Sequence, residues 1–291
     1  TEDLLLSLPM SLTTGHTSQT KNLGKLNNNG LEFELDLDLI RSENFNWSVG
    51  GNFSTVNNEV TDMPIVNGTQ ITITGGTTRT QVGYPVSGWY MRKYAGVDPA
   101  NGNALWYANG VDGATTTNYN AAVQAWQGES ALPKYSGGFN THVDLNNFYF
   151  DATLYVAGGH KVYEDWAAYT QGHGTLSLVS YNGSEPLLNR WQKAGDITNV
   201  PKVEYAPTAG NAFASSTSTR FLHDGDFMRL RDVTFGYNFK SDILSQFKLD
   251  GLSFSLRGTN LFTWVKDKDL KYDPEVRADG FTRLTSPPVK S

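Results

Sequence analysis

The chain has 291 residues, of which 29 are glycine and 12% are aromatic, a composition that favours β-strands joined by polar loops. It has no cysteine, which excludes disulfide frameworks and thiol catalysis, and no run of about 18 apolar residues, which excludes a membrane-spanning helix. Its formal net charge is −6, from 23 basic and 29 acidic residues without a basic stripe, which argues against nucleic-acid binding.

The chain opens at residues 1–6 with what resembles the middle of a strand, so we expect an N-terminal portion to precede it. The clearest pattern follows at 31–40, where apolar and acidic residues alternate strictly. Period 2 places all the apolar side chains on one face of a strand and all the acids on the other. These residues are Leu31, Phe33, Leu35, Leu37 and Leu39, against Glu32, Glu34, Asp36 and Asp38. A short turn at 41–44 and a second alternating stretch at 45–53 complete a predicted hairpin.

The same pattern occurs twice more. Residues 139–145 and 148–156 alternate around a turn near Asn146, and 233–239 and 252–256 alternate around a turn at roughly 241–250. The connections between the hairpins are far longer, about 75 residues at 58–132 and about 60 at 159–219, which is unusual inside a compact soluble domain. Short turns at one end and long loops at the other are typical of bacterial outer-membrane barrels.

Two features within these stretches have competing explanations. Aromatic residues near the strand ends suit the interfacial girdles of a barrel, but aromatic residues also simply favour strands. They are Phe45, Trp47, Tyr237, Phe239, Phe262 and Trp264. In the first long connection, residues 84–94 predict a strand broken by Pro85 and Gly88, and a turn at 98–103 with a return at 105–107 predicts a small β-excursion.

The sequence shows no catalytic constellation, and we expect no enzyme. The acids of residues 32–38 are better explained as a charged lumen wall than as catalytic pairs. The five histidines are scattered without metal-site spacing: His16, His142, His160, His173 and His223. Calcium could be held at 224–226 or at the Asp98 turn, although plain turns explain both segments better.

The aromatic residues of the long connections are the candidate substrate-binding residues. Exposed aromatic rings stack on sugar rings or pack against a partner protein, whereas the alternative is that they hold long loops together. The candidates are Trp106, Tyr107, Trp126, Trp166, Tyr169 and Trp191.

Several motifs in order resemble the SusC-like family of TonB-dependent transporters. They begin with NLGKLNNNGLE at 22–32, GYPVSGWY at 83–90 with AGVDP at 95–99, and LPKYSGG at 132–138. NRW at 189–191 with TNVP at 198–201 follows, and the most specific is FLHDGDFMRLRDVTFGY at 221–237. NLFTW at 260–264 and YDPEV at 272–276 come last. The resemblance spans nearly the whole chain, but the family's plug, its TonB-contacting segment, its earlier strands and its closing strand are not in it.

The resemblance implies an all-β, antiparallel transmembrane β-barrel, of which residues 1–291 form a C-terminal segment with about seven to nine strands, long extracellular loops and short periplasmic turns. It implies energised uptake of a glycan oligomer or peptide through the outer membrane of a Gram-negative bacterium, with a SusD-like surface lipoprotein as lid and TonB contacted by parts outside the chain. Two other functions remain open, a passive porin or structural barrel and a soluble glycan-binding β-sandwich.

Overall fold

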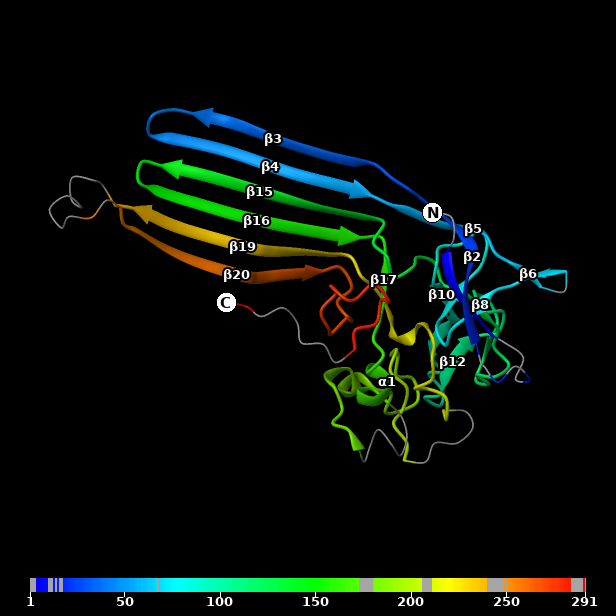
Figure 1. The fold of residues 1–291 in the computed structure, drawn as a ribbon. Helices are drawn as coiled ribbons and strands as arrows, with labels where there is room; N and C mark the ends of the chain where they lie inside the picture. The colour runs from blue at the N-terminus through cyan, green and yellow to red at the C-terminus, as the bar shows by residue number, and fades with distance from the viewer. Residues whose placement is uncertain are drawn as a thin grey trace.

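A computed structural model describes residues 4–9, 13, 15, 18–66, 68–172, 180–205, 211–239, 249, 251–283 and 290. Two regions stand out in Figure 1: a long antiparallel sheet, and a unit of short strands and loops gathered at one end of it. We call the second region the loop unit; it comprises the described residues of 63–134, 159–226 and 266–283. None of the described helices is long and apolar enough to cross a membrane.

The sheet has six strands in the order β20-β19-β16-β15-β4-β3, and all neighbours are antiparallel. The strands are β3 (Glu32–Arg41), β4 (Phe45–Thr55), β15 (Tyr135–Leu145), β16 (Phe148–Gly158), β19 (Phe227–Asn238) and β20 (Ser253–Val265). The three predicted hairpins are therefore confirmed, although the predicted turn at 241–250 lies outside the described residues except for 249. Seven to nine strands were expected, but the other strands among the described residues are shorter or belong to separate sheets.

The first hairpin continues beyond the sheet. β2 (Ser18–Asn29) pairs with β5 (Asn57–Asp62) and with β1 (Leu4–Pro9), which confirms the strand expected at the start of the chain. The backbone N–H of Thr55 donates to the Leu31 carbonyl over 2.8 Å, so the two ladders join. Gly30 is required at this junction because a Cβ there would collide with the Thr55 carbonyl. Residues 18–62 thus form one long, bent hairpin.

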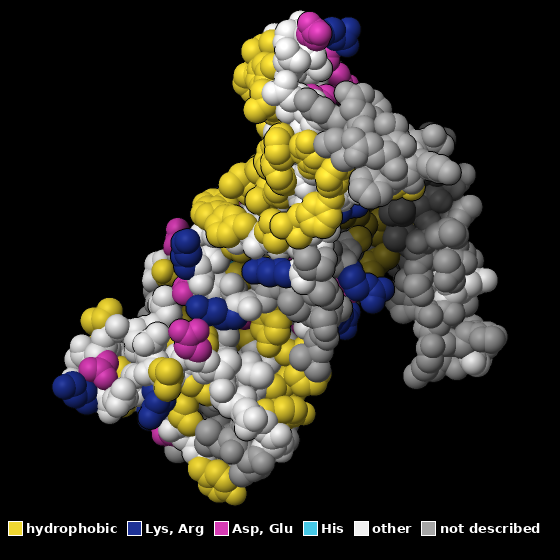
Figure 2. All heavy atoms as spheres, turned by 90° about the vertical axis from the view of Figure 1, so that its left-hand side faces the viewer, with side chains coloured by type: hydrophobic (Ala, Val, Ile, Leu, Met, Phe, Trp, Pro, Cys, Tyr) yellow, Lys and Arg dark blue, Asp and Glu magenta, His cyan; other side chains and the backbone are white. Residues whose placement is uncertain are grey.

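The two faces of the sheet separate by side-chain polarity. On one face Phe33, Phe53, Phe139, Phe235 and Leu256 are all exposed, Phe33 by 61% and Leu256 by 70%. A register shift between Asp38 and Ile40 marks a bulge at Leu39, which sets Ile40 opposite Trp47. Figure 2 looks at the hairpin ends and shows hydrophobic side chains gathered in a band along one side of the sheet. The large apolar residues of this region therefore lie outside, not in a core.

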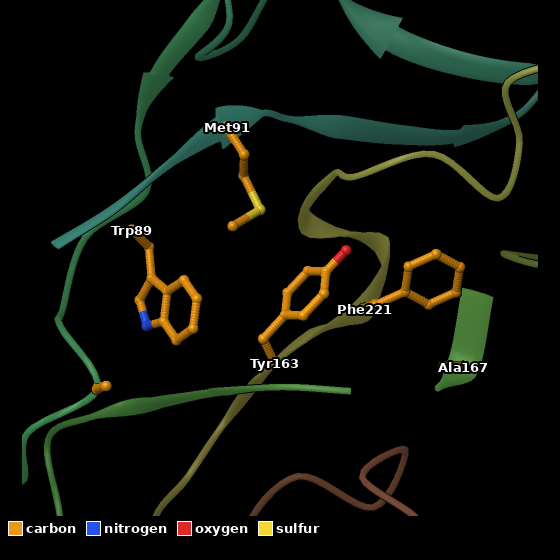
Figure 3. Packing of buried hydrophobic residues seen from close by; sticks show 6 residues of the cluster. Trp89, Met91, Tyr163, Ala167 and Phe221 are labelled. Atoms are coloured by element: carbon orange, nitrogen blue, oxygen red, sulfur yellow. The ribbon is translucent and has the colours of Figure 1, made fainter. Parts of the chain in front are cut away.

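The loop unit is organised in the ordinary way, around buried residues. Trp89 and Met91 of β10 (Gly88–Arg92) pack with Tyr163 of β17 (Lys161–Tyr163) and Phe221 of the 3-10 helix η3 (Thr219–Phe221). Figure 3 shows the Tyr163 ring between the rings of Trp89 and Phe221. A second cluster surrounds Trp106.

The remaining elements of the loop unit are short. They are β6 (Ile65–Val66), β7 (Thr69–Gln70), β8 (Ile73–Thr74), β9 (Thr78–Thr80), β11 (Tyr94–Val97), β12 (Ala104–Tyr107), β13 (Thr115–Thr116), β14 (Gln124–Trp126), α1 (Ala167–Thr170), the 3-10 helix η2 (Glu185–Asn189) and β18 (Leu222–Asp224). The predicted excursion is confirmed as the β11–β12 pair, but the strand predicted over 84–94 is shorter, because a turn occupies the residues around Pro85 and β10 begins only at Gly88.

Candidate functional site

The polar face of the sheet carries a network of charges. The acids of β3 share this face with His142, whose Nδ1 lies 2.6 Å from Asp151 and whose Nε2 lies 3.1 Å from Asp144. Farther along the same face, Arg257 pairs with Asp232 at 2.6 Å. The carboxylates therefore sit in an extended polar wall and are mostly exposed, as the expectation of a charged wall predicts.

Two of the quoted motifs meet in space. Arg229 of β19 is 1% exposed, and its Nη2 lies 2.6 and 2.7 Å from the two carboxylate oxygens of Asp273. Its Nη1 lies 3.0 Å from Glu275, which also binds Arg231. The Arg231 guanidinium lies 4.2 Å from the centre of the Tyr155 ring. The YDPE residues thus anchor the segment after β20 to the polar face of β19 at the edge of the loop unit.

The same segment then runs into the core of the loop unit. Tyr163 donates its N–H to the Gly280 carbonyl over 2.8 Å, and Thr282 donates back to the Tyr163 carbonyl over 3.1 Å. This pairing brings the Phe281 ring to 5.6 Å from both Trp89 and Tyr163. Residues 266–283 consequently tie the end of the sheet to the core shown in Figure 3.

A buried ionic group lies beside this tie. Glu164 is fully buried, accepts the Lys271 N–H at 2.7 Å and lies 3.7 Å from His223 Nε2. His223 Nδ1 lies 3.2 Å from Asp267. Burial raises the pKa of Glu164, and the hydrogen bond with His223 lowers the pKa of Asp267 to about 2. Burial alone would lower the pKa of His223, but Asp267 and Glu164 raise it overall.

The two segments considered for calcium have other partners. Asp98 accepts the Ala100 N–H at 2.9 Å and the Asn101 side-chain amide at 2.6 Å, as in an ordinary turn. Asp224 lies 2.9 Å from Lys161, and Asp226 lies 3.1 Å from Lys266. Within the described ranges no three His, Cys, Asp or Glu residues gather as a metal site would need. His16 and His173 fall outside those ranges.

The candidate aromatic residues do not form one site. Trp106 is 1% exposed and packs edge-on against Tyr94 and Tyr119, so its ring is part of a core. Trp191 donates its Nε1–H to the Pro99 carbonyl over 3.0 Å and packs so closely on Gly102 that a Cβ there would clash. Both rings therefore pack against neighbouring loop residues.

The other four candidates are half-buried, except Tyr169, which is exposed. Trp126 stacks on Tyr84 with ring centres 3.9 Å apart, whereas Trp166 and Tyr169 form a group with Tyr181. Tyr107 lies beneath Lys93 and lines a cavity.

Sequence reasoning singled out none of the groups formed by Arg229, Asp273, Glu164 and Asp267 as a site. The members of each group are distant in the chain. The sequence connects Arg229 with Asp273 only because each lies in a motif of the family resemblance, at 221–237 and 272–276.

The chain has relatives among known proteins, although no profile of a known protein family matches it. It is 25% identical to TonB-dependent receptor P3 of Formosa agariphila over 286 residues, which cover 91% of the chain and 27% of that receptor. It is also 25% identical to the TonB-dependent receptor SusC of Bacteroides thetaiotaomicron over 302 residues, covering 96% of the chain and 27% of SusC.

Among solved structures, the chain resembles the RagAB peptide transporter with a TM-score of 0.78 and 28% identity. The match covers 96% of this chain and 30% of the matched chain, in its C-terminal region. The chain therefore spans less than a third of the length of these relatives. Their family consists of transporters and not enzymes, which confirms the expectation that this chain is not an enzyme. The motif resemblance is also confirmed: the chain is distantly homologous, over most of its length, to the SusC-like TonB-dependent receptors.

Proposed function

We propose that the protein takes up a large nutrient, a glycan oligomer or a peptide, through the outer membrane of a Gram-negative bacterium as a SusC-like TonB-dependent transporter. Residues 1–291 are then part of one β-barrel with its extracellular loops. The observation that carries the proposal is the apolar face of the six-stranded sheet, which is exposed in the described residues although it is rich in phenylalanine and leucine. A soluble sandwich would bury such a face against a second sheet.

Strand length fits a membrane wall. Strands of 10 to 13 residues extend for roughly 33–43 Å at about 3.3 Å per residue, enough to cross the apolar part of a bilayer at a tilt of about 45°. Trp47 and Phe239 lie near the hairpin turns, whereas Phe262 and Trp264 lie at the opposite end, opposite Leu230 and Met228. Aromatic residues at both ends support the girdle interpretation.

The relatives support two proposed partner proteins. RagAB is a peptide transporter and the other relatives are TonB-dependent receptors, so we propose a SusD-like lipoprotein on the extracellular side and energy coupling through TonB. The half-exposed group of Trp166 and Tyr169 remains our proposed stacking surface for substrate, with Trp126 and Tyr107 as further candidates.

Membrane fractionation of the full-length protein tests this proposal. Recovery in the outer membrane, with a mobility on gels that changes on boiling, is the expected result for a closed barrel. A protein recovered in the soluble fraction without a mobility shift would overturn it. Uptake that continues in cells lacking TonB would instead favour the passive porin. Co-purification of a lipoprotein with the full-length protein tests the proposed SusD-like partner.

A further inference from the structure

The loop unit contains a cavity of about 600 Å³, a volume in the range of ordinary ligand sites. It opens between β11, η2, η3 and the segment after β20. Most of its lining is polar and includes amide, hydroxyl and charged groups in addition to the tyrosine rings. Among the lining residues are Lys93, Tyr94, Tyr107, Glu185, Arg220 and Asp267.

Two cations of this cavity have no carboxylate partner within the described part of the chain. The guanidinium of half-buried Arg220 donates to two backbone carbonyls, of Ala214 at 2.7 Å and Gln171 at 3.1 Å. Lys93 Nζ lies 5.4 Å from the centre of the Tyr107 ring. Burial lowers the pKa of Arg220 to about 10, which leaves it cationic at neutral pH. The carbonyls orient the Arg220 fork but do not neutralise its charge.

The acids of the cavity are placed differently. Asp267 is held by His223, and Glu185 lies 3.9 Å from Lys271 on the solvent side. Asp269 is exposed. Asp267 and Glu185 therefore have nearby cations, and Asp269 faces solvent. Arg220 and Lys93 are the cavity's two cations without a carboxylate beside them among the described residues, so a carboxylate that enters the cavity would supply one.

The surroundings of these two cations suit an organic ligand. The backbone N–H of Tyr94 donates to Thr219 Oγ1 over 2.9 Å, and the Tyr94 hydroxyl donates to the Asn199 carbonyl over 3.0 Å. These two hydrogen bonds fix the position of the Tyr94 ring. The Arg220 guanidinium lies 6.0 Å from the centre of that ring. Arg220 thus lies beside the fixed Tyr94 ring and Lys93 beside the Tyr107 ring. Charge-assisted hydrogen bonds to a carboxylate are stronger at such a partly desolvated site than in water.

We propose that this cavity binds a carboxylate group of the transported molecule between Arg220 and Lys93. The inference rests on the proposed function only in taking the ligand to be cargo. A carboxylate of this kind occurs on uronic acid residues of acidic glycans and at the C-terminus of a peptide, and the two sources share the same recognition chemistry.

Equilibrium binding to the purified full-length protein in detergent tests the site. The probes are trigalacturonic acid against its neutral counterpart galactotriose, and trialanine against trialanine amide. We expect one carboxylate probe to bind at least tenfold more tightly than the partner that lacks the carboxylate, and the pair that shows this difference identifies the source. Equal affinity within both pairs, or no binding of either carboxylate probe, would overturn the proposal.

Substitution of the two cations tests where the carboxylate probe binds. Lys93→Gln is expected to lower the affinity for the carboxylate probe about tenfold, and Arg220→Gln about a hundredfold. The reason is that hydrogen bonds to charged groups are worth about 1.5–3 kcal/mol each. Lys193→Gln, at an exposed lysine outside the cavity, is the matched control and leaves binding unchanged. If Arg220→Gln fails to fold, Lys93→Gln decides, and unchanged affinity in that variant refutes the site.

The two proposals fail in different ways. Carboxylate binding that survives together with TonB-independent uptake would contradict the transport proposal and leave the site intact. TonB-dependent uptake of carboxylate cargo that ignores Lys93→Gln and Arg220→Gln would contradict the site alone.

Discussion

The sheet and the loop unit use the same residue types in opposite ways. In the loop unit, Trp89 and Phe221 are 0% exposed and stabilise a conventional core. In the sheet, side chains of the same size, such as Phe235, stand exposed on one face, while charged and amide groups line the other. The difference shows that the surroundings of each region, and not its overall hydrophobicity, decide where the apolar residues lie. The proposed bilayer and water account for both patterns in one chain.

The largest expected effect is at the junction of the two regions. Arg229→Met would leave Asp273, whose side chain is 15% exposed, without its partner, so we expect the free energy of unfolding to fall by about 3–5 kcal/mol. Denaturation of the full-length protein in detergent micelles measures it. Arg257→Met is the control on the same face, because its side chain is 66% exposed and an exposed pair is worth about 0–1 kcal/mol. Equal losses in the two variants would show that Arg229 does not hold the regions together.

The next prediction concerns the two faces of β3. Leu37→Arg places a charge on the proposed lipid face and is expected to cost about 2–4 kcal/mol near the middle of the bilayer, seen as less heat-modifiable protein in the membrane. Glu34→Arg, three residues earlier on the polar face, should fold nearly as well as the parent. If both variants behave alike, the comparison between lipid and lumen faces is wrong.

A smaller effect is expected from pH in the loop unit. Because the pKa of His223 is raised in the folded protein, its stabilising contribution is full below about 6.5 and is lost as pH rises through the raised value. The pKa of Glu164 is also raised in the folded protein, so its contribution to stability likewise decreases as pH rises. The pKa of Asp267 is lowered, so its contribution is lost only as pH falls towards about 2. Protease resistance of the loop unit should therefore be higher at pH 6 than at pH 9. Each tenfold gain in proton affinity on folding would add about 1.4 kcal/mol to that difference.

His223→Asn tests this assignment, since it should flatten the change between pH 6 and pH 9. The strands of the sheet provide the internal comparison and should remain protected throughout. A pH dependence that persists unchanged in the variant would assign it to other groups.

The smallest effect is local. Trp191→Phe keeps a ring against Gly102 but removes the hydrogen bond to the Pro99 carbonyl, which is worth about 1 kcal/mol. Hydrogen exchange at the Lys202 amide, which donates to the Gly102 carbonyl, should accelerate by several-fold. Unchanged exchange there would mean that ring packing alone holds this loop.

The sequence predicted strands wherever alternation was unbroken. Residues 31–40 and 148–156 became β3 and β16 almost as expected. β19 begins six residues before the predicted start at Val233, because the register shift around Arg231 interrupts the alternation there. β20 likewise extends past the predicted 252–256 to Val265, beyond an irregularity between Thr259 and Phe262.

The site was predicted less well, because it depends on contacts between distant segments. Four-residue strands such as β12 are too short to show which face is buried, so Trp106 could not be separated from Tyr107 as a core residue. Lys93 and Arg220 lie far apart in the chain, and their shared cavity arises only when η3 packs beside β11.

The long hairpin of residues 18–62 constrains how such proteins can change in evolution. The same register continues across the junction of its two ladders, from Leu26 opposite Val60 to Asp38 opposite Ser48. A single-residue insertion near Gly30 would therefore turn the side chains on one side of the insertion to the opposite face. The loops at 63–134 carry no such penalty, because they close on themselves in short strands. These loops can therefore lengthen and change shape while the sheet keeps its residue count, so the proposed transporter could gain new substrate preferences without rebuilding its strands.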